Sequence, residues 1–413
     1  MRRILDLILR RFVVVGRLTV RWPDGSQSVY GGAPGPQAAL ALRDAATVRR
    51  VALNPGLAVG EAYMNGGLVP VDGSIYDVLD TMQTNLAADQ SAHPVLRAQD
   101  ALRRLTRRIA QFNPASRSQR NVAHHYDLSA ELYALFLDRD RQYSCAYFQS
   151  GDETLEAAQI AKKRHIAAKL KLDRPDLEVL DIGCGWGGMA LTLAKEYGAR
   201  VTGITLSTEQ LAAARARAQA EGLADRVTFE LRDYRALDRQ FDRIVSVGMF
   251  EHVGVNHYRG FFDVVKRSLA PDGVALLHAI GRNGPPAATN PWIAKYIFPG
   301  GYCPALSEVM PAIEQARLCT TDIEVLRLHY AETLRHWRRR FAASRDTIAG
   351  LYDERFCRMF EFYLCGSELA FRREGLMIFQ IQLTRDQTAV PLTRDYMLDA
   401  ERTGAVQERL AAE

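Results

Sequence analysis

Between residues 178 and 383 the sequence alternates short apolar runs with longer helix-like stretches, and this alternation restricts the fold more than any other feature. The apolar runs predict buried strands; they are EVLDI (178–182), RVTGIT (200–205), VTFELR (227–232), RIVSVG (243–248), VALLHAI (274–280), IEVLRLH (323–329) and LMIFQIQL (376–383). The helix expected after the second run begins at Ser207, a typical N-cap residue, and ends at Gly222. Strands that alternate with helices predict a parallel sheet with helices on both faces, so we expect a doubly wound α/β domain.

A glycine-rich loop follows the first of these strands. Gly183, Gly185 and Gly188 satisfy the pattern G-x-G-x-x-G, which is typical of dinucleotide-binding loops. In a doubly wound sheet such a loop lies at the carboxyl ends of the strands, where the backbone can approach a ligand closely. The loop therefore predicts a nucleotide-bearing ligand, but it does not by itself distinguish a dinucleotide from S-adenosylmethionine (SAM).

The residues around the loop favour SAM. A dinucleotide site needs an acidic residue about 20 positions further on to bind the ribose, and the second strand ends instead in Thr205, Leu206 and Ser207. Asp181 precedes the glycines, where its charge would repel a diphosphate and attract a cation. We therefore expect SAM in this loop, and a dinucleotide is a distant second candidate.

The first part of the chain differs from the rest in composition. Leu18, Val20 and Trp22 alternate with polar residues before a Pro-Asp-Gly turn, a pattern that predicts a β-hairpin within a small mixed α/β domain. The first 120 residues contain 16 arginines, no lysine and nine acidic residues, although the whole chain has a net charge of only +5. Such a basic region suits a phospholipid surface or a nucleic acid, but it can also serve solubility alone.

A basic amphipathic helix is expected within RAQDALRRLTRRIAQF (97–112). Leu102, Leu105 and Ile109 recur at helical spacing, and four arginines (Arg103, Arg104, Arg107 and Arg108) occupy the other faces. This helix can lie on anionic lipid or act as a solvated linker, and the two interpretations have equal weight. The chain is thus divided into an N-terminal lipid-engaging domain (1–95), a basic helix and linker (96–120) and a catalytic domain (121–413).

The cysteines and the apolar segments indicate the compartment. The six cysteines show no C-x-x-C pair and no zinc-ligand spacing, so reduced thiols and no metal site are expected. Arg10 and Arg11 interrupt the apolar N-terminal run, which argues against a signal peptide, and no stretch is long enough to span a bilayer. We expect a cytoplasmic protein that associates peripherally with the membrane.

Several motifs in the second part of the chain together resemble one enzyme family. They are NVAHHYDLSAELYALFLDRDRQYSCAYF (121–148), GCGWGG, GITLSTEQ, DRIVSVGMFEHVG (242–254), ALLHAIGR (275–282), YIFPGGY (296–302) and HYAETLRHW (329–337). In this order they resemble the cyclopropane-fatty-acyl-phospholipid synthases and the mycolic acid cyclopropane synthases. The resemblance covers residues 121–390 and implies the seven-stranded sheet of class I SAM-dependent methyltransferases, with a Rossmann-like arrangement of helices on both faces.

The resemblance implies a reaction on unsaturated fatty acyl chains of phospholipids at a membrane surface. It implies no nucleic acid as partner, and it allows a homodimer. A cis double bond attacks the methyl group of SAM, and the resulting carbocation loses a proton as it closes to a cyclopropane ring. Bound bicarbonate takes that proton in the family. By resemblance, the catalytic and bicarbonate-binding residues are Cys145, Glu251, His278, Ile280 through its backbone, and Tyr330. Tyr302 and Phe148 are candidates for stabilising the cation through their aromatic faces.

The resemblance also assigns the SAM-binding residues, which are Tyr143, Ser144, Asp181, Gly183, Gly185, Gly187, Thr205, Leu206, Gln210, Asp233 and Tyr234. Trp186 ranks lower because it can simply pack. Taken alone, Cys145 and His278 read as core residues, whereas Glu251 stands just past a strand end, where this fold does its chemistry. Ser367 replaces a cysteine that many family members carry; the mechanism needs no thiol nucleophile, so we expect Ser367 to be tolerated and Cys365 to lie in the core.

Three alternatives remain at this point. The same carbocation can give a methyl-branched or methylene-bearing chain without ring closure, because its fate depends on where the base lies. The chain can also be a methyltransferase of a soluble small molecule, or a lipid-binding protein with a vestigial site. The intact glycine loop and Glu251 argue against the last of these.

Overall fold

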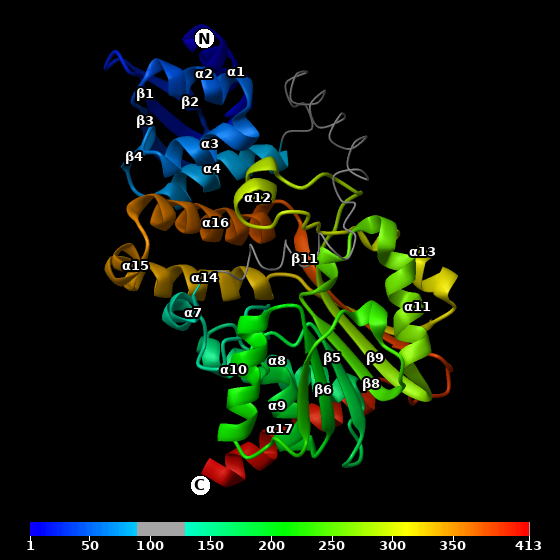
Figure 1. The fold of residues 1–413 in the computed structure, drawn as a ribbon. Helices are drawn as coiled ribbons and strands as arrows, with labels where there is room; N and C mark the ends of the chain where they lie inside the picture. The colour runs from blue at the N-terminus through cyan, green and yellow to red at the C-terminus, as the bar shows by residue number, and fades with distance from the viewer. Residues whose placement is uncertain (89–128, 413) are drawn as a thin grey trace. The chain divides into compact units, whose positions relative to one another are not determined.

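The computed structural model describes residues 1–88 and 129–412, with side chains at residues 1–87 and 129–403. The basic helix expected at 96–120, with its leucines and arginines, lies outside the described residues. The chain forms two compact units. The first contains the N-terminal part together with residues 287–299 and 334–376, and the second contains most of the remainder. Two stretches of the expected catalytic region therefore pack with the N-terminal elements, and Figure 1 labels most of the helices and strands named below.

The first unit is built on a small sheet of four strands in the order β2-β1-β3-β4. Its strands are β1 (Val15–Arg21), β2 (Gln27–Gly31), β3 (Ala33–Leu42) and β4 (Leu68–Asp72). Its helices are α1 (Arg2–Phe12), α2 (Ala45–Leu53), α3 (Pro55–Met64), α4 (Ile75–Ala88), α12 (Pro291–Tyr296), α15 (Arg345–Leu351) and α16 (Glu354–Arg373), together with most of α14 (His329–Ala343). The expected hairpin is present, because β1 and β2 pair antiparallel.

One apolar core joins this sheet to a helix from the far end of the sequence. Leu18 and Val20 of β1 share a buried cluster with Cys365 and Leu369 of α16. Cys365 is 2% exposed and is a core residue, as expected. Ser367 lies on the same helix in a half-buried position. The family's cysteine position thus belongs to the first unit, whereas Asp181 and Glu251 belong to the second.

The second unit contains the seven-stranded sheet, in the order β10-β11-β9-β8-β5-β6-β7. The strands are β5 (Glu178–Ile182), β6 (Arg200–Thr205), β7 (Val227–Leu231), β8 (Phe241–Val247), β9 (Leu269–Arg282), β10 (Cys319–Leu326) and β11 (Leu376–Thr384). The helices are α7 (Ala130–Phe136), α8 (Leu155–Lys169), α9 (Gly188–Tyr197), α10 (Thr208–Ala220), α11 (Tyr258–Ser268), α13 (Leu306–Ala316) and α17 (Asp395–Ala412). Three short 3-10 turns are η1 (Tyr234–Ala236), η2 (Phe250–His252) and η3 (Val255–His257).

The sheet departs from the expectation at one edge. Strands β5 to β9 pair in parallel, but β10 and β11 pair antiparallel. The run 323–329 was expected as a strand; the structure ends β10 at Leu326 and begins α14 at His329. The pairing of β10 with β11 also ends at Leu326, so residues 327–329 of the expected strand have no partner on β11. Periodicity does not reveal this change, because short apolar runs fit strand and helix alike.

Helices cover both faces of the sheet, as expected. Leu180 and Ile182 of β5 pack with α11 and α13 in one apolar cluster, whereas Val179 packs with α8 and α9 in another. Successive side chains of a strand point to opposite faces, so one short strand contributes to both cores. The N-cap expected at Ser207 is present, since its side chain accepts a hydrogen bond from the backbone of Gln210. Within the described ranges, 1–88 and 129–412, the chain has no helix with the length and hydrophobicity needed to cross a bilayer.

Candidate active site

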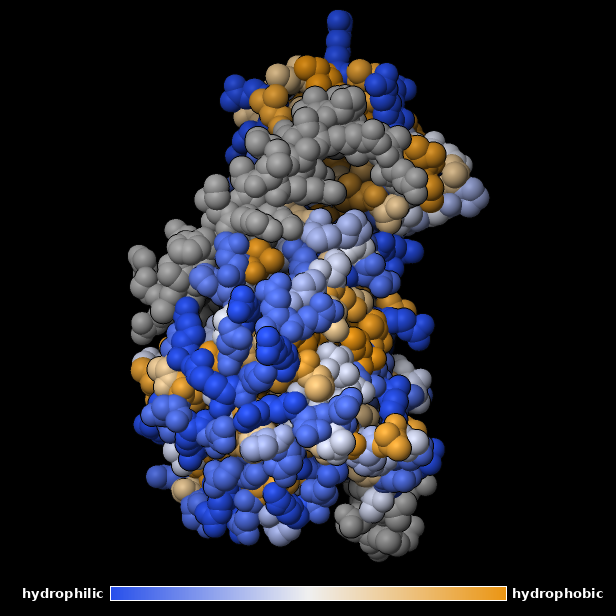
Figure 2. All heavy atoms as spheres, turned by 90° about the vertical axis from the view of Figure 1, so that its right-hand side faces the viewer, coloured by the Kyte–Doolittle hydropathy of each residue, from blue (hydrophilic) through white to orange (hydrophobic). Residues whose placement is uncertain are grey.

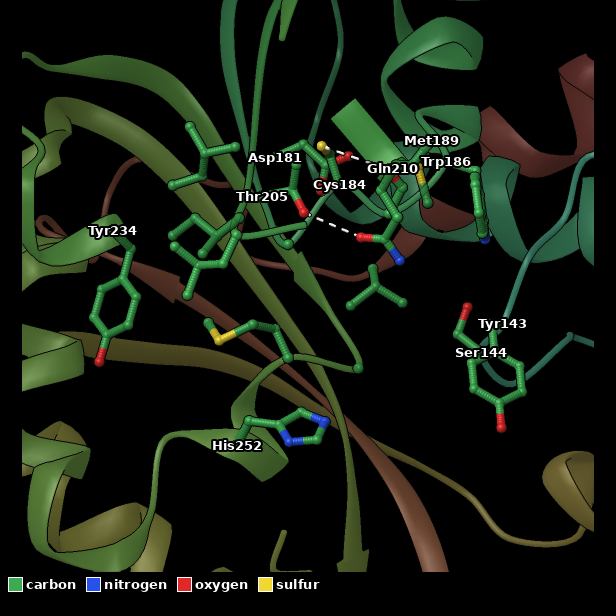
Figure 3. A pocket seen from close by; sticks show the side chains of 18 of the residues that line it. Tyr143, Ser144, Asp181, Cys184, Trp186, Met189, Thr205, Gln210, Tyr234 and His252 are labelled. Carbon is green, nitrogen blue, oxygen red and sulfur yellow. Dashed lines mark hydrogen bonds between the residues drawn. The ribbon is translucent and has the colours of Figure 1, made fainter. Parts of the chain in front are cut away.

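A pocket opens at the carboxyl ends of β5, β6 and β8. It is lined by every residue predicted to bind SAM except Gly187, and also by Arg141, Gln142, Cys184, Trp186, Met189, Gly248, Met249 and His252. Figure 3 shows how these side chains converge from different elements: Tyr234 lies on one side, Tyr143 and Ser144 on the opposite side, and Asp181 with Cys184 between them. The strand order brings these ends together, as the doubly wound arrangement requires.

The three predicted glycines of the loop have different tasks. Gly183 and Gly185 have φ angles of +84° and +54°, and a Cβ added to Gly185 would meet no atom within 4 Å. Gly185 therefore leaves open space toward the pocket. Gly187, at φ +86°, caps α9, and a Cβ there would lie 2.8 Å from the ring of Phe229. Gly187 thus allows α9 to pack against β7 and does not line the pocket.

Asp181 is the buried acid of the pocket. It is 2% exposed, and its Oδ2 has no hydrogen-bond partner. Burial raises the pKa of Asp181 to about 7, and the positive charge of Lys162 acts in the opposite direction. An unpartnered carboxylate oxygen in the interior is costly, and a cationic ligand with N–H or O–H donors would satisfy it. The acid therefore fits a SAM molecule, whose amino group and ribose hydroxyls are donors.

The end of β6 is organised by a side-chain hydrogen bond. Thr205 Oγ1 donates to Gln210 Oε1 at 3.0 Å, drawn as a dashed line in Figure 3, and both side chains are buried. Ser207 N–H in turn donates to Thr205 Oγ1 at 3.1 Å. This network fixes the turn that carries Leu206 along the pocket wall.

Asp233 and Tyr234 follow β7. Asp233 accepts hydrogen bonds from Arg235 at 2.8 and 2.6 Å. Burial favours a raised pKa for Asp233, but these bonds from Arg235 outweigh it and keep the pKa below its usual value. Tyr234 is packed edge-on against Phe261, with ring centroids 5.4 Å apart. An aromatic ring beside an ionised acid suits an adenosine, whose base can pack on the ring and whose donors can bond to the carboxylate.

Sequence reasoning missed several residues of this pocket. Gln142 and Arg141 precede the predicted Tyr143 directly, and Met249 and His252 flank Glu251, so proximity to a predicted site was the available signal. Burial lowers the pKa of His252 to about 4, so this ring is neutral near pH 7. Trp186 lines the pocket and also packs at 5.9 Å between ring centroids against Tyr133, which supports its lower rank.

Glu251 lies in the 3-10 turn after β8 and is 8% exposed. Its Oε1 accepts a hydrogen bond of 2.6 Å from the backbone N–H of Ile280, whereas its Oε2 is buried without a partner. Burial raises the pKa of Glu251 to about 7 despite this hydrogen bond. The structure thus brings together two of the predicted catalytic residues and leaves one carboxylate oxygen for a ligand.

His278 stands two residues before Ile280 on β9, so both side chains point to the same face of the sheet. His278 is 1% exposed; its Nδ1 lies 3.1 Å from Gln380 Nε2, and its Nε2 has no partner. Burial holds the pKa of His278 far below its usual value, so the ring is neutral. Because the amide NH₂ of Gln380 can only donate, Nδ1 is the acceptor and the ring proton belongs on Nε2, the orphaned atom.

Cys145 and Tyr330 come from other elements. Cys145 is 1% exposed, its thiol contacts the carbonyl of Ala146, and burial raises its pKa. The Ala146 N–H donates to Thr333 Oγ1 at 3.0 Å, and Thr333 lies one helical turn after Tyr330 on α14. Residues three apart share a helix face, so the side of α14 that carries Tyr330 faces the Cys145 segment. Tyr330 itself is 7% exposed.

Comparisons with known proteins agree with this geometry. The family model described as mycolic acid cyclopropane synthetase matches residues 114–381, and a domain of unknown function (DUF7884) matches residues 7–91. The chain is 39% identical over 359 residues to the cyclopropane-fatty-acyl-phospholipid synthase of Escherichia coli, covering 87% of this chain and 90% of that protein. It is 36% identical over 405 residues to the tuberculostearic acid methyltransferase UfaA1 of Mycobacterium tuberculosis, covering 93% and 91%.

Solved structures lead to the same assignment. The cyclopropane synthase MmaA2 from Mycobacterium tuberculosis superposes with a TM-score of 0.62 at 32% identity, covering 66% of this chain and 99% of that one. The mycolic acid cyclopropane synthase CmaA1, solved with S-adenosylhomocysteine (SAH), gives a TM-score of 0.61 at 33% identity with the same coverage. This chain therefore belongs to the mycolic acid cyclopropane synthetase family and is a SAM-dependent C-methyltransferase.

Proposed function

We propose that the protein transfers the methyl group of SAM to the cis double bond of an unsaturated fatty acyl chain of a phospholipid, and that the chain then closes to a cyclopropane ring. The observation that carries this proposal is that Glu251 Oε2 and His278 Nε2 are both buried without a hydrogen-bond partner, while Ile280, two residues after His278, holds the other oxygen of Glu251 through its backbone N–H. Similarity to the Escherichia coli cyclopropane-fatty-acyl-phospholipid synthase supports the substrate class.

SAM, when bound, supplies an electrophilic methyl group on a sulfonium. The alkene is a weak nucleophile that no side chain can activate, so the protein contributes alignment and exclusion of water. Asp181 would accept hydrogen bonds from SAM, and the turn held by Thr205 and Gln210 would position the SAM molecule. The π electrons form the new bond to carbon, the sulfur keeps the electron pair of the broken bond, and the positive charge passes to the acyl chain.

Ring closure requires the loss of a proton from the new methyl group. The free oxygen of Glu251 and the free ring nitrogen of His278 suit a small oxyanion such as bicarbonate, which would accept that proton. A neutral His278 with its proton on Nε2 would donate to such an anion, and Glu251 Oε2 would accept from the anion's own hydroxyl. Tyr330 is proposed as a further donor, and Cys145 as part of the wall. Glu251 thus positions the base and does not act as a nucleophile.

A second outcome of the same carbocation deserves testing. The tuberculostearic acid methyltransferase of Mycobacterium tuberculosis matches 93% of this chain at 36% identity, and its name denotes a methylated fatty acid product. A hydride shift before proton loss would give a methyl-branched or methylene-bearing chain here as well. The position of the base relative to the cation decides between the products.

We also propose that the protein meets its lipid at a membrane surface, and helix α1 supports this. Leu5 and Leu9 are buried in the first unit, whereas Ile4 and Leu7 are 49% and 48% exposed. Arg2 and Arg10 form ion pairs with Asp24 and Asp6.

Two further arginines of α1, Arg3 and Arg11, have no carboxylate partner among the described residues. Exposed apolar side chains beside unpaired cations suit an anionic bilayer. In Figure 2 hydrophobic and hydrophilic groups lie side by side at the N-terminal end.

The test is the lipid composition of cells that express the protein. We expect unsaturated phospholipid chains to gain the mass of one CH₂ group. We also expect the product to resist ozonolysis, as a cyclopropane does. A product with the same gain that ozonolysis cleaves would indicate a methylene branch and favour the second outcome. Unchanged lipids, with methyl transfer to soluble small molecules in an extract, would contradict the proposed substrate class. A Gly185→Val variant, expressed equally, is the matched control.

A further inference from the structure

A buried lysine beneath the SAM pocket has no role in the mechanism described so far. Lys162, on α8, is 0% exposed, although a buried charge costs several kcal/mol unless it is compensated. Its Nζ donates to Gln142 Oε1 at 2.6 Å and to Ser144 Oγ at 2.9 Å. Both partners are neutral, and no carboxylate among the described residues forms an ion pair with Lys162. Its neighbour Lys163, by contrast, pairs directly with Asp140 at 2.7 Å.

The two partners of Lys162 belong to the pocket wall. Gln142 and Ser144 line the pocket, and Gln159 of α8 holds the same segment through a 3.0 Å hydrogen bond from its Nε2 to the Ser144 carbonyl. The segment also lies against the start of α9, because a Cβ added to Gly188 would come within 2.4 Å of Gln142 Nε2. Lys162 thus connects α8 to the wall segment that faces the ligand.

The charge of Lys162 also reaches the chemistry-bearing groups. Burial lowers the pKa of Lys162 to about 8, so it remains mostly protonated near pH 7. Burial raises the pKa values of Asp181 and Cys145, and the charge of Lys162 lowers both. The same positive charge repels a cation in the pocket directly, in opposition to the attraction that Asp181 exerts on it. The sulfonium of SAM is such a cation, and its product SAH has a neutral sulfur.

We propose that Lys162 is a positioning residue that holds Gln142 and Ser144 against the ligand, and that its charge sets the balance between SAM and SAH. This inference rests on the proposed function only in taking SAM as the methyl donor. Methyl transfer moves the positive charge from sulfur to the acyl chain. A fixed cation whose charge reaches the pocket therefore favours neutral SAH over charged SAM, and loss of that cation stabilises SAM before the transfer.

The test measures the dissociation constants of SAM and SAH by calorimetry for the wild type and four variants. Lys162→Met and Lys162→Gln remove the charge and Lys162→Arg keeps it. Lys163→Met loosens the same segment, because it removes the ion pair with Asp140 and leaves the one between Asp140 and Arg217. A loosened wall weakens both ligands alike, so the ratio of the two constants isolates the charge. We expect the neutral variants to shift this ratio toward SAM by about three- to tenfold, which is roughly 1 kcal/mol. We expect Lys162→Arg and Lys163→Met to leave the ratio at the wild-type value.

Activity provides the second readout. We expect kcat of Lys162→Met to fall at saturating SAM, because tighter ground-state binding and a looser wall both raise the barrier. A ratio unchanged in Lys162→Met and Lys162→Gln would overturn the role of the charge, and unchanged affinities with unchanged kcat would overturn the whole inference. Wild-type protein that binds neither SAM nor SAH would instead contradict the proposed function. Thermal unfolding of each variant identifies one that fails to fold, and having two neutral variants keeps the test decisive.

Discussion

The backbone N–H of Ile280 donates a 2.6 Å hydrogen bond to one oxygen of Glu251, while the other oxygen is buried without a partner. The first contact fixes the carboxylate, and the second oxygen is the one that can receive a ligand. Burial raises the pKa of this carboxyl to about 7, so its charge is sensitive to what binds beside it. This division of work between the two oxygens is what a residue needs if it orients a base.

We expect Glu251→Gln to lower turnover by roughly 10² to 10⁴, as for loss of an acid–base group. The amide keeps the size of the side chain, but it directs an N–H toward the site and accepts fewer hydrogen bonds. SAH affinity should stay within a few-fold of the wild type. Labelled methyl transfer and calorimetry measure the two quantities, with the exposed Glu314→Gln as control. Near-normal turnover, or failure to bind SAH, would contradict the assignment of Glu251.

We expect Gly185→Val to abolish SAM binding. A Cβ at Gly185 meets no protein atom within 4 Å, so the valine would occupy the ligand's space. Its φ of +54° also strains a β-branched residue. Gly222→Val is the matched control, because Gly222 has a φ of +68° and equally open surroundings but lies in the turn after α10 and does not line the pocket. Calorimetry that finds SAM bound by Gly185→Val, or lost in Gly222→Val, would refute this reading.

Much of the fold and of the pocket follows from local sequence. The alternation of apolar runs indicates the sheet, and the glycines after β5 with the polar end of β6 indicate the ligand. Chemistry at strand ends is predictable because parallel strands all end at one edge.

Features that depend on distant contacts were not predictable. Gly187 resembles a ligand glycine, but its neighbour is Phe229 of β7. Lys162 lies in the run KKR, which reads as a solvated face, yet its partners are 18 and 20 residues away. Likewise, nothing in the pattern of 354–373 indicates that α16 packs with β1.

Stability without ligand should depend on pH through Asp181 and Glu251. Burial raises both pKa values to about 7, so the folded protein keeps protons that the unfolded chain releases between roughly pH 4 and pH 7. Their contribution to the free energy of unfolding therefore falls as pH rises through this window.

We expect Asp181→Asn and Glu251→Gln to melt above the wild type at about pH 8, and the gap to narrow at about pH 5. Differential scanning calorimetry of the ligand-free proteins measures this gap, with Glu314→Gln as control. Equal gaps at the two pH values would show that these carboxyls are not the cause.

Membrane binding should depend on α1. Replacing Arg3 and Arg11 by Gln should weaken binding to vesicles of anionic phospholipid by roughly ten- to thirtyfold, at about 1 kcal/mol for each basic residue near the surface. The binding of the wild type should fall with salt, which screens charges over about 8–10 Å at physiological ionic strength.

Replacing Ile4 and Leu7 by Ser should weaken binding at every salt concentration, because buried apolar area is insensitive to screening. Val29→Ser, at a residue 48% exposed on β2, is the control for an exposed apolar side chain elsewhere. Unchanged vesicle binding in both α1 variants would remove α1 as the contact, and a change in molecular mass on sedimentation would identify its exposed face as an interface between two copies of the chain.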